Sequence, residues 1–326
     1  MIMTGLLGPI PKAEYSHNAA WARLWAKLLK AEISPVIPDS GDVVLFFNIN
    51  FDGVTLNLFG GLTKELFDRL DAFINSNASF STVDHDMPDL GKAFFKRLEN
   101  NTTYEKFSAE FLEKLTAKCK AVKTLRMTDF NYTDMIIGDS HSMSYATDNM
   151  IVSRNDGKTM NGICNDPEFI YSKIPSKIKN ITLMFGSIDI RHHMFRLRGD
   201  PYENAKNLLE KYKSLVHNLQ ERGLSVTICC PVPIETEQRK MAETTKYKGQ
   251  PFTGSREDRL KMTKFFIDYF QTNFKNVISY PTEWYDMDPQ EFEDTIMERP
   301  KSIHVGWPNF RINNFGKNLE NNLEDW

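Results

Sequence analysis

The chain has 326 residues, of which 41% are hydrophobic and 25% charged, and its formal net charge is −3. This is the composition of a globular protein with a buried core, and it excludes the strongly basic balance of a nucleic-acid coat protein. No apolar stretch approaches the roughly 20 residues that a membrane helix needs, and the first residues lack the basic and apolar segments of a signal peptide. The four cysteines show no CxxC spacing. We therefore expect a cytoplasmic protein of one or two domains, without membrane partners.

Apolar residues at helical spacing predict that region 1–130 is α-rich. Its predicted helices are 17–32, 63–73, about 90–99 and about 104–122. One apolar run, 43–47, predicts a short strand. The stretch 46–61 interleaves aromatic and amide side chains and is predicted to be a hairpin or loop beside the sheet. The triplet Asp84-His85-Asp86 carries metal-ligand side chains, but its polar surroundings favour a solvated loop.

After residue 130, strand and helix patterns alternate, and this alternation predicts parallel strands joined by crossover helices. The predicted strands are 133–138, 149–152, 180–185, 224–230 and 276–280. The predicted helices include 202–222, 256–274 and a last one over 309–324, and 235–256 is predicted to be a polar loop. We thus predict two domains, an α-rich region 1–130 with a short strand or hairpin and an α/β domain over 131–326.

The tetrapeptide Gly138-Asp139-Ser140-His141 follows the first apolar strand of this second region. It places a hydroxyl at the carboxyl end of a strand, where open α/β sheets build their sites. A glycine before the serine permits a tight turn, and backbone N–H groups at the turn would serve as oxyanion donors. The alternative is that Asp139 or Ser140 only caps a helix. A serine here is a nucleophile only if a base can reach it.

A second strand also ends at a glycine, in Phe185-Gly186-Ser187-Ile188-Asp189-Ile190-Arg191. The ends of successive parallel strands lie along one sheet edge, so this patch is expected beside the first. Asp189 and Arg191 are predicted either to pair with each other or to orient a substrate. The adjacent His192 and His193 cannot easily face one metal together, so a metal role is disfavoured.

A candidate base comes late in the chain, in Ser302-Ile303-His304-Val305-Gly306. This histidine lies in a loop between Pro300 and Pro308, which suits a rigidly held general base. Most single histidines are structural, so His304 gains weight only together with Ser140.

These three patches, in this order, resemble the conserved blocks of the SGNH/GDSL hydrolase superfamily over about residues 130–326. The resemblance implies a flavodoxin-like three-layer α/β sandwich with a parallel sheet, and the chemistry of esterases, lipases, carbohydrate deacetylases or acyltransferases. It implies Ser140 as nucleophile and His304 as base, with the backbone N–H of Ser140 and of a glycine as the oxyanion hole. The further residues implied are Gly186, Ser187, Asp189 and Arg191 for orienting the oxyanion or substrate, and Asp139 and His141 as support. No metal and no cofactor is implied.

Two departures from the family pattern affect the expected site. Ile188 stands where the third block, Gly-x-Asn-Asp, has its asparagine, and Lys301 stands where the acid three residues before the histidine is usual. Either a backbone carbonyl orients His304 or the acid comes from elsewhere, and the nearby candidates are Asp286, Asp288 and Glu298. The second-block glycine is either Gly157 or Gly162.

Other functions compete with a serine esterase for the same residues. An SGNH-fold acyltransferase or a catalytically lapsed binding module fits the altered blocks. A binuclear metallophosphoesterase would use Asp139-Ser140-His141 as its first motif, but its Gly-Asn-His motif is absent from the sequence. The expected partner is a small-molecule or glycan ester, with lipids, modified nucleotides and nucleic acid also open. The oligomeric state is not predicted.

Overall fold

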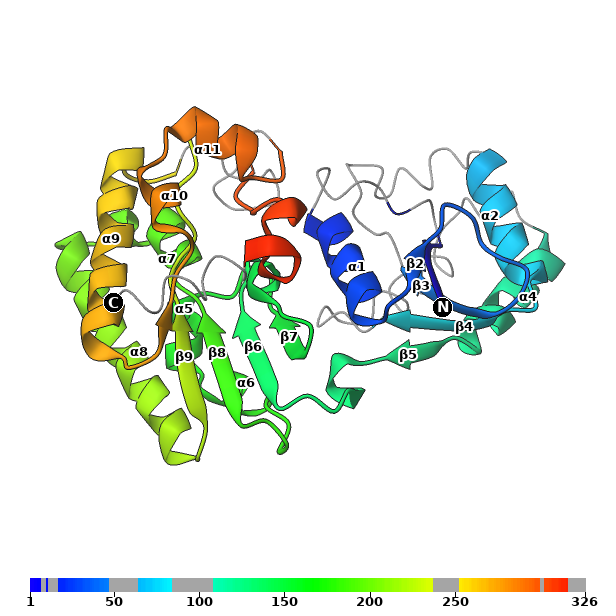
Figure 1. The fold of residues 1–326 in the computed structure, drawn as a ribbon, viewed down its shortest axis with the longest axis horizontal. Coiled ribbons are helices and arrows are strands. Elements are labelled where there is room, and N and C mark those ends of the chain that lie inside the picture. Colours follow the sequence, from blue (N-terminus) through cyan, green and yellow to red (C-terminus); the bar gives the residue numbers. More distant parts are fainter. Residues whose placement is uncertain are drawn as a thin grey trace. The chain divides into compact units, whose positions relative to one another are not determined.

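The computed structural model describes residues 1–6, 10, 17–46, 64–83, 108–236, 252–299 and 302–315. The chain divides into two compact units, Met1–Phe130 and Asn131–Trp326 (Figure 1). Among these residues each unit has its own five-stranded sheet, and the strand pairs within both sheets are parallel. The predicted parallel α/β architecture is therefore confirmed. In the described part of the chain, no helix combines the length and apolar character needed to cross a bilayer.

The N-terminal unit contains more strand than the sequence indicated. Its strands are β1 (Ile2–Gly5), β2 (Glu32–Ile33), β3 (Asp42–Phe46), β4 (Ser79–Val83) and β5 (Lys123–Leu125), in the order β2-β1-β3-β4-β5. Its helices are α1 (His17–Leu28), α2 (Lys64–Asn75) and α4 (Ala109–Lys120). We expected an α-rich region with one short strand or hairpin. Only β3 has a continuous apolar run, whereas β4 reads Ser-Phe-Ser-Thr-Val and β5 has three residues, so hydrophobicity did not reveal them.

Four predicted features of this unit lie wholly or largely outside the described residues. They are the helix at about 90–99, the aromatic and amide stretch 46–61, the triplet Asp84-His85-Asp86 and the first part of the helix at about 104–122.

The C-terminal unit is built on a sheet that carries the first predicted motif at the end of an inner strand. Its strands are β6 (Asp134–Gly138), β7 (Met150–Arg154), β8 (Asn180–Met184), β9 (Ser225–Cys229) and β10 (Val277–Ile278), in the order β10-β9-β8-β6-β7. Counted along the chain this is the order 2-1-3-4-5, in which the chain reverses its direction of winding between the first and third strands. This reversal lies between β6 and β8. The N-terminal sheet has the same order.

The register of β6 with β7 and β8 brings the loops that follow these three strands to one edge of the sheet. Gly138 on β6 is the partner of Arg154 on β7 and of Met184 on β8. Each strand therefore ends at the same level, and the segments that follow leave from one sheet edge. This is the edge at which the sequence predicted the site.

Helices lie between β7, β8, β9 and β10, and two more follow β10, whereas β6 and β7 are joined through a short 3-10 turn (Ser142–Tyr145). The helices are α5 (Met160–Asn165), α6 (Glu168–Tyr171), α7 (Ser187–His192), α8 (Pro201–Glu221), α9 (Arg256–Asn273), α10 (Thr282–Asp286) and α11 (Pro289–Thr295). The longest, α8, begins where Asp200 accepts hydrogen bonds from the backbone N–H groups of Tyr202 and Glu203. This helix contacts β9 and α9, and four leucines are among its buried residues, Leu208, Leu209, Leu215 and Leu219. The sheet is thereby covered by apolar helix faces.

The end of the chain differs from the predicted helix over 309–324. The structure has a short 3-10 turn over Trp307–Asn309 and a single π-helical turn over Arg311–Phe315. Residues 316–326, like most of the predicted polar loop 235–256, lie outside the described residues. Pro308 and the pair Asn313-Asn314 disfavour a regular α-helix here, which explains the shorter turns.

Candidate active site

Ser140 lies at the carboxyl end of β6, two residues beyond Gly138, and only 8% of its surface is exposed. The glycine is dictated by packing, since a Cβ at position 138 would lie 2.5 Å from the carbonyl oxygen of Met184 on β8. Such a separation is shorter than any real carbon–oxygen contact, so no side chain fits. The close approach of β6 and β8 therefore sets the point at which the serine loop leaves the sheet.

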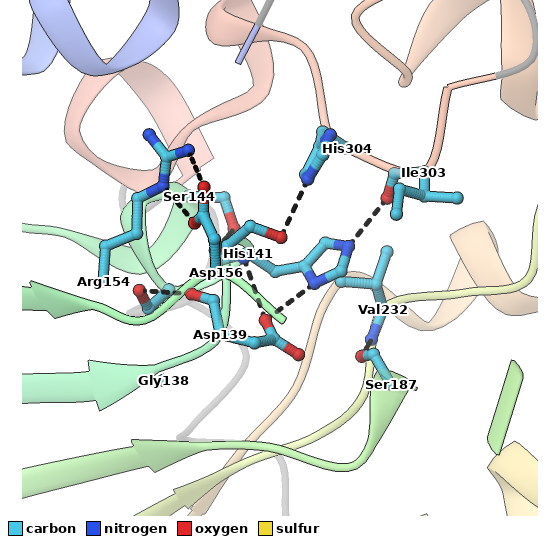
Figure 2. A network of polar contacts seen from close by, with 12 residues as sticks. Gly138, Asp139, His141, Ser144, Arg154, Asp156, Ser187, Val232, Ile303 and His304 are labelled. Carbon is cyan, nitrogen blue, oxygen red and sulfur yellow. Dashed lines mark hydrogen bonds and ion pairs between the residues drawn. The ribbon is translucent and has the colours of Figure 1, made fainter. Parts of the chain in front are cut away.

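His304, which comes near the end of the sequence of this unit, contacts Ser140. Its Nε2 lies 2.9 Å from the Oγ of Ser140, across 164 residues of sequence (Figure 2). This is hydrogen-bond distance between a nucleophile and a base, the geometry that serine hydrolysis needs. Two residues that the sequence placed in separate loops are thus brought together.

A carboxylate lies on the far side of the His304 ring. The Oε1 atom of Glu298 is 3.6 Å from His304 Nδ1, and the Glu298 side chain is 2% exposed. Ser302 fixes this arrangement, because its Oγ donates to Glu298 Oε1 at 2.7 Å and accepts from the backbone N–H of His304 at 3.1 Å. The sequence left the acid open among three residues, and the geometry singles out Glu298.

The other two acids have different partners. Asp286 forms an exposed ion pair with Lys264 at 2.7 Å. Asp288 begins α11, where its Oδ1 accepts from the backbone N–H groups of Gln290 and Glu291. Neither carboxylate is engaged with His304.

Asp139 and His141, the residues flanking the serine, contact each other. His141 Nδ1 lies 2.8 Å from Asp139 Oδ1, and the same oxygen accepts from the backbone N–H of His141 at 2.9 Å. The other ring nitrogen, Nε2, lies 2.9 Å from the carbonyl oxygen of Ile303 (Figure 2). The two side chains expected to support the serine therefore also reach the loop that carries the base.

The backbone N–H groups of Ser140 and of the two candidate glycines differ in whether they are already engaged. In the described part of the chain, the N–H of Ser140 donates to no acceptor. The N–H of Gly157, in the loop after β7, likewise has no acceptor among the described residues, whereas that of Gly162 donates to Thr159 Oγ1 at 2.9 Å within α5. Of the two glycines that the sequence left open, Gly157 has the unengaged donor.

Gly186 and Ser187 join strand β8 to helix α7. Gly186 has a φ of 113°, a left-handed conformation that favours glycine, and it immediately precedes the helix. The Oγ of Ser187 accepts a hydrogen bond from the backbone N–H of Val232 at 3.1 Å. Ser187 thus ties the end of β8 to the segment that follows β9.

Asp189 and Arg191 do not pair with each other, which corrects one of the two predicted roles. The carboxylate of Asp189, which is fully buried, accepts from the backbone N–H groups of Met160 at 2.7 Å and Asn161 at 3.1 Å. These bonds hold the first turn of α5. Burial raises the pKa of Asp189 to about 6, although the same backbone donors act in the opposite direction.

Arg191 forms a buried ion pair with Glu235, at 2.6 Å between Nε and Oε2, and also donates to the carbonyl oxygen of Pro233. Burial raises the pKa of Glu235, but the guanidinium of Arg191 outweighs this effect and holds the pKa below its usual value. Both charged residues of the patch therefore connect backbone segments around the site. In these contacts neither engages Ser140 or His304.

His192 is the last residue of α7, and His193 follows it directly. The ring of His192 packs edge-on against Phe252, with 4.8 Å between ring centroids, and burial lowers its pKa to about 3. Among the described residues, no three His, Cys, Asp or Glu side chains gather closely enough to hold a metal ion.

One polar pair at this edge was missed by the sequence reasoning. Arg154, at the end of β7, binds Asp156 through two nitrogens, at 2.6 and 2.5 Å. Arg154 is the register partner of Gly138, so the pair stands at the same sheet edge as the serine loop (Figure 2). The available signal was the i, i+2 spacing of opposite charges directly after a predicted strand.

Comparison with known proteins gives similarity only at the level of three-dimensional structure. No family model matches the chain, and no curated protein matches it. Among solved structures, an acetyl xylan esterase is 13% identical, with a TM-score of 0.39 over 57% of this chain and 98% of that one. A carbohydrate acetylesterase from Sinorhizobium meliloti is 12% identical, with a TM-score of 0.38 over 60% and 99% of the two chains. A protein assigned to the lipolytic G-D-S-L family, from Desulfitobacterium hafniense, is 12% identical, with a TM-score of 0.37 over 58% and 98%. The chain is thus similar, at low identity and over 57–60% of its length, to two esterases and to a protein of the lipolytic G-D-S-L family.

Proposed function

We propose that this protein is a serine hydrolase of the SGNH type that cleaves an acyl ester or carbohydrate ester through an acyl-enzyme at Ser140. The observation that carries the proposal is the 2.9 Å contact between Ser140 Oγ and His304 Nε2, with Glu298 on the opposite side of the imidazole. Serine is a weak nucleophile at neutral pH and needs such a base. A hydroxyl that only capped a turn would have no need of a histidine brought from a distant loop.

The reaction follows from the positions of these three side chains. His304 Nε2 takes the proton of Ser140 as Oγ forms a bond to the ester carbonyl carbon. The resulting imidazolium is stabilised by the Glu298 carboxylate near Nδ1. When the tetrahedral intermediate collapses, the bond to the alkoxide breaks and His304 gives its proton to the leaving oxygen. A water molecule, deprotonated by the same nitrogen, then attacks the acyl-enzyme and releases the carboxylic acid and the free serine.

The oxyanion is assigned to backbone donors. The N–H groups of Ser140 and Gly157 have no acceptors among the described residues, and backbone N–H groups are established oxyanion donors in acyl transfer. Ile188 contributes no side-chain donor at the third-block position. Since one missing oxyanion donor costs roughly 10²–10³ in rate, we expect slower turnover than a site with the asparagine would give.

The geometry favours the serine mechanism over the metallophosphoesterase alternative. A binuclear site would use Asp139 and His141 as metal ligands. Here the His141 ring has Asp139 on one nitrogen and the carbonyl oxygen of Ile303 on the other. Each ring nitrogen therefore points at one of these partners, so in this arrangement neither nitrogen can bind a metal ion.

The test combines a fluorophosphonate probe with hydrolysis of para-nitrophenyl acetate. Wild-type protein is expected to be labelled and to release nitrophenol, and Ser140→Ala is expected to lose both. Ser144→Ala is the matched control, because it removes another buried hydroxyl of the same loop and should leave labelling intact. Labelling that persists in Ser140→Ala would contradict the proposal. Labelling by the probe without hydrolysis of para-nitrophenyl acetate would instead identify an acyltransferase if an added alcohol acceptor restored nitrophenol release.

A further inference from the structure

The His141 ring connects the nucleophile loop with the base loop. One nitrogen contacts the carboxylate of Asp139, and the other contacts the carbonyl oxygen of Ile303 at 2.9 Å, across 162 residues (Figure 2). Ser140 stands between the two residues of the first contact, and His304 directly follows the residue of the second. The bridge thus holds the neighbours of both reacting side chains.

Both partners of the ring are hydrogen-bond acceptors. A neutral histidine has only one N–H, so it can satisfy only one of two acceptors. The carbonyl oxygen of Ile303 can only accept, so the bridge requires that Nε2 of His141 carry the hydrogen of that contact. Both side chains are only 1% exposed, so a broken contact would leave a buried polar atom unpaired, which is costly.

The surroundings hold this ring in one orientation. Asp139 is itself fixed, because its Oδ1 also accepts from the backbone N–H of His141 and its carbonyl oxygen accepts from Ser142 Oγ at 2.8 Å. The ring of His141 lies beside that of His304, with 5.0 Å between centroids. A displacement of His141 would therefore change the position of both the serine loop and His304.

We infer that His141 is a positioning residue, which sets the distance between Ser140 Oγ and His304 Nε2 by joining the Asp139 carboxylate to the Ile303 carbonyl. This inference rests on the proposed function, because it assigns His141 a part in the same reaction. His141 touches no reacting atom in this mechanism. It acts through the backbone on either side of the catalytic pair.

The expected signature is a loss of turnover without a loss of binding. A misplacement of about 1 Å between reacting groups costs on the order of 10²-fold in rate. We expect His141→Ala to lower kcat and the rate of fluorophosphonate labelling by roughly that factor, with KM within about twofold of wild type. His141→Gln retains an amide N–H that can reach the Ile303 carbonyl, so it should recover part of the loss.

The matched control is Tyr280→Phe. It removes a buried hydroxyl that lies 2.8 Å from Ser144 Oγ, and so perturbs the same loop without touching the bridge. Melting temperatures of all variants identify losses caused by unfolding. If His141→Ala does not fold, His141→Gln carries the comparison, because a positioning role still predicts a lower kcat for it. Wild-type kcat and labelling in His141→Gln, or a loss no larger than that of Tyr280→Phe at equal stability, would overturn the inference.

A second measurement does not depend on activity. In ¹⁵N NMR spectra of the full-length wild-type protein, His141 Nε2 should carry a proton, as the bond to the Ile303 carbonyl requires. An unprotonated Nε2 would mean that the bond to Ile303 is absent, and the inference would be wrong. Failure of the proposed function has a different result, since labelling would then persist in Ser140→Ala while the Nε2 proton of His141 remained.

Discussion

Glu298 and His304 are joined twice, once through side chains and once through the backbone. Oε1 of Glu298 lies 3.6 Å from Nδ1 of His304, and the N–H of Glu298 donates to the carbonyl oxygen of His304 at 3.0 Å. The second contact closes the loop between them, so the carboxylate and the imidazole are held by the same local structure. The acid of this site therefore belongs to the base's own loop.

Replacing Glu298 by glutamine should impair catalysis while the loop persists. The amide keeps an oxygen that accepts from Ser302 Oγ, but it removes the negative charge that stabilises the imidazolium. We expect kcat to fall roughly 10- to 1,000-fold. We also expect the acidic limb of the kcat/KM profile to move to lower pH, because protonated His304 loses its counter-charge. Hydrolysis rates across pH 5–9 measure both effects, and an unchanged profile would remove Glu298 from the mechanism.

Gly138→Ala should be strongly destabilising. Its methyl group would lie 2.5 Å from the Met184 carbonyl oxygen and 2.9 Å from Met184 Cβ, so β6 and β8 would have to separate. We expect a loss of at least about 3 kcal/mol in the free energy of unfolding. Gly223→Ala is the control, with a φ of 87° but open space around the new methyl group. It should lose only the roughly 1–2 kcal/mol of left-handed backbone strain. Equal losses in urea denaturation would contradict this explanation.

Tyr212→Phe should leave the protein as stable as wild type or make it more stable. The Tyr212 hydroxyl is fully buried and has no hydrogen-bond partner in the described structure, and its removal eliminates a desolvation cost of about 1–3 kcal/mol. Tyr285→Phe provides the contrast, because that hydroxyl donates to the carbonyl oxygen of Pro231 at 2.8 Å. It should cost about 1 kcal/mol. Thermal unfolding of the two variants tests the difference in sign.

Asp189 should make stability depend on pH in mildly acidic solution. Burial raises the pKa of its carboxyl from the ordinary 3.8 to about 6, so the folded protein takes up this proton before the unfolded chain does. The folded state then binds more protons between about pH 6 and 4, and the contribution of Asp189 to stability increases as pH falls through that window. In wild type minus Asp189→Asn, the unfolding free energy should change by at most about 1.4 kcal/mol per pH unit. A difference that is flat from pH 4 to 7 would contradict this origin.

The sequence predicted the pair Ser140 and His304, which we propose to be catalytic, because both residues carry local signals. An apolar strand that stops at Gly138 marks the loop of Ser140, and a proline-bounded loop marks His304. Chain order and parallel topology then suffice to place both at one sheet edge. The contact between them is set by packing over 164 residues, which no local pattern expresses.

Partners of charged residues were less predictable. Asp189 and Arg191 are two positions apart, and the spacing allowed a pair, yet the first binds the backbone of α5 and the second binds Glu235. A buried charge takes whichever partner lies within reach in three dimensions. The same applies to Glu298, which was one of three nearby acids until the loop geometry distinguished it. In the N-terminal sheet β3 was predicted from its apolar run, and the other strands were missed because they are short or rich in serine and threonine.

The distance along the chain between Ser140 and His304 has a consequence for folding. The first lies in the loop after the opening strand of the C-terminal unit, and the second comes after its last strand. Contacts between such distant residues form late, because closing a long loop costs entropy that only the packed sheet and helices offset. His304 does not lie beside Ser140 while the segment that follows β10 is unpacked. Recovery of probe labelling during refolding would therefore report completion of this unit, whereas circular dichroism would follow its earlier helices.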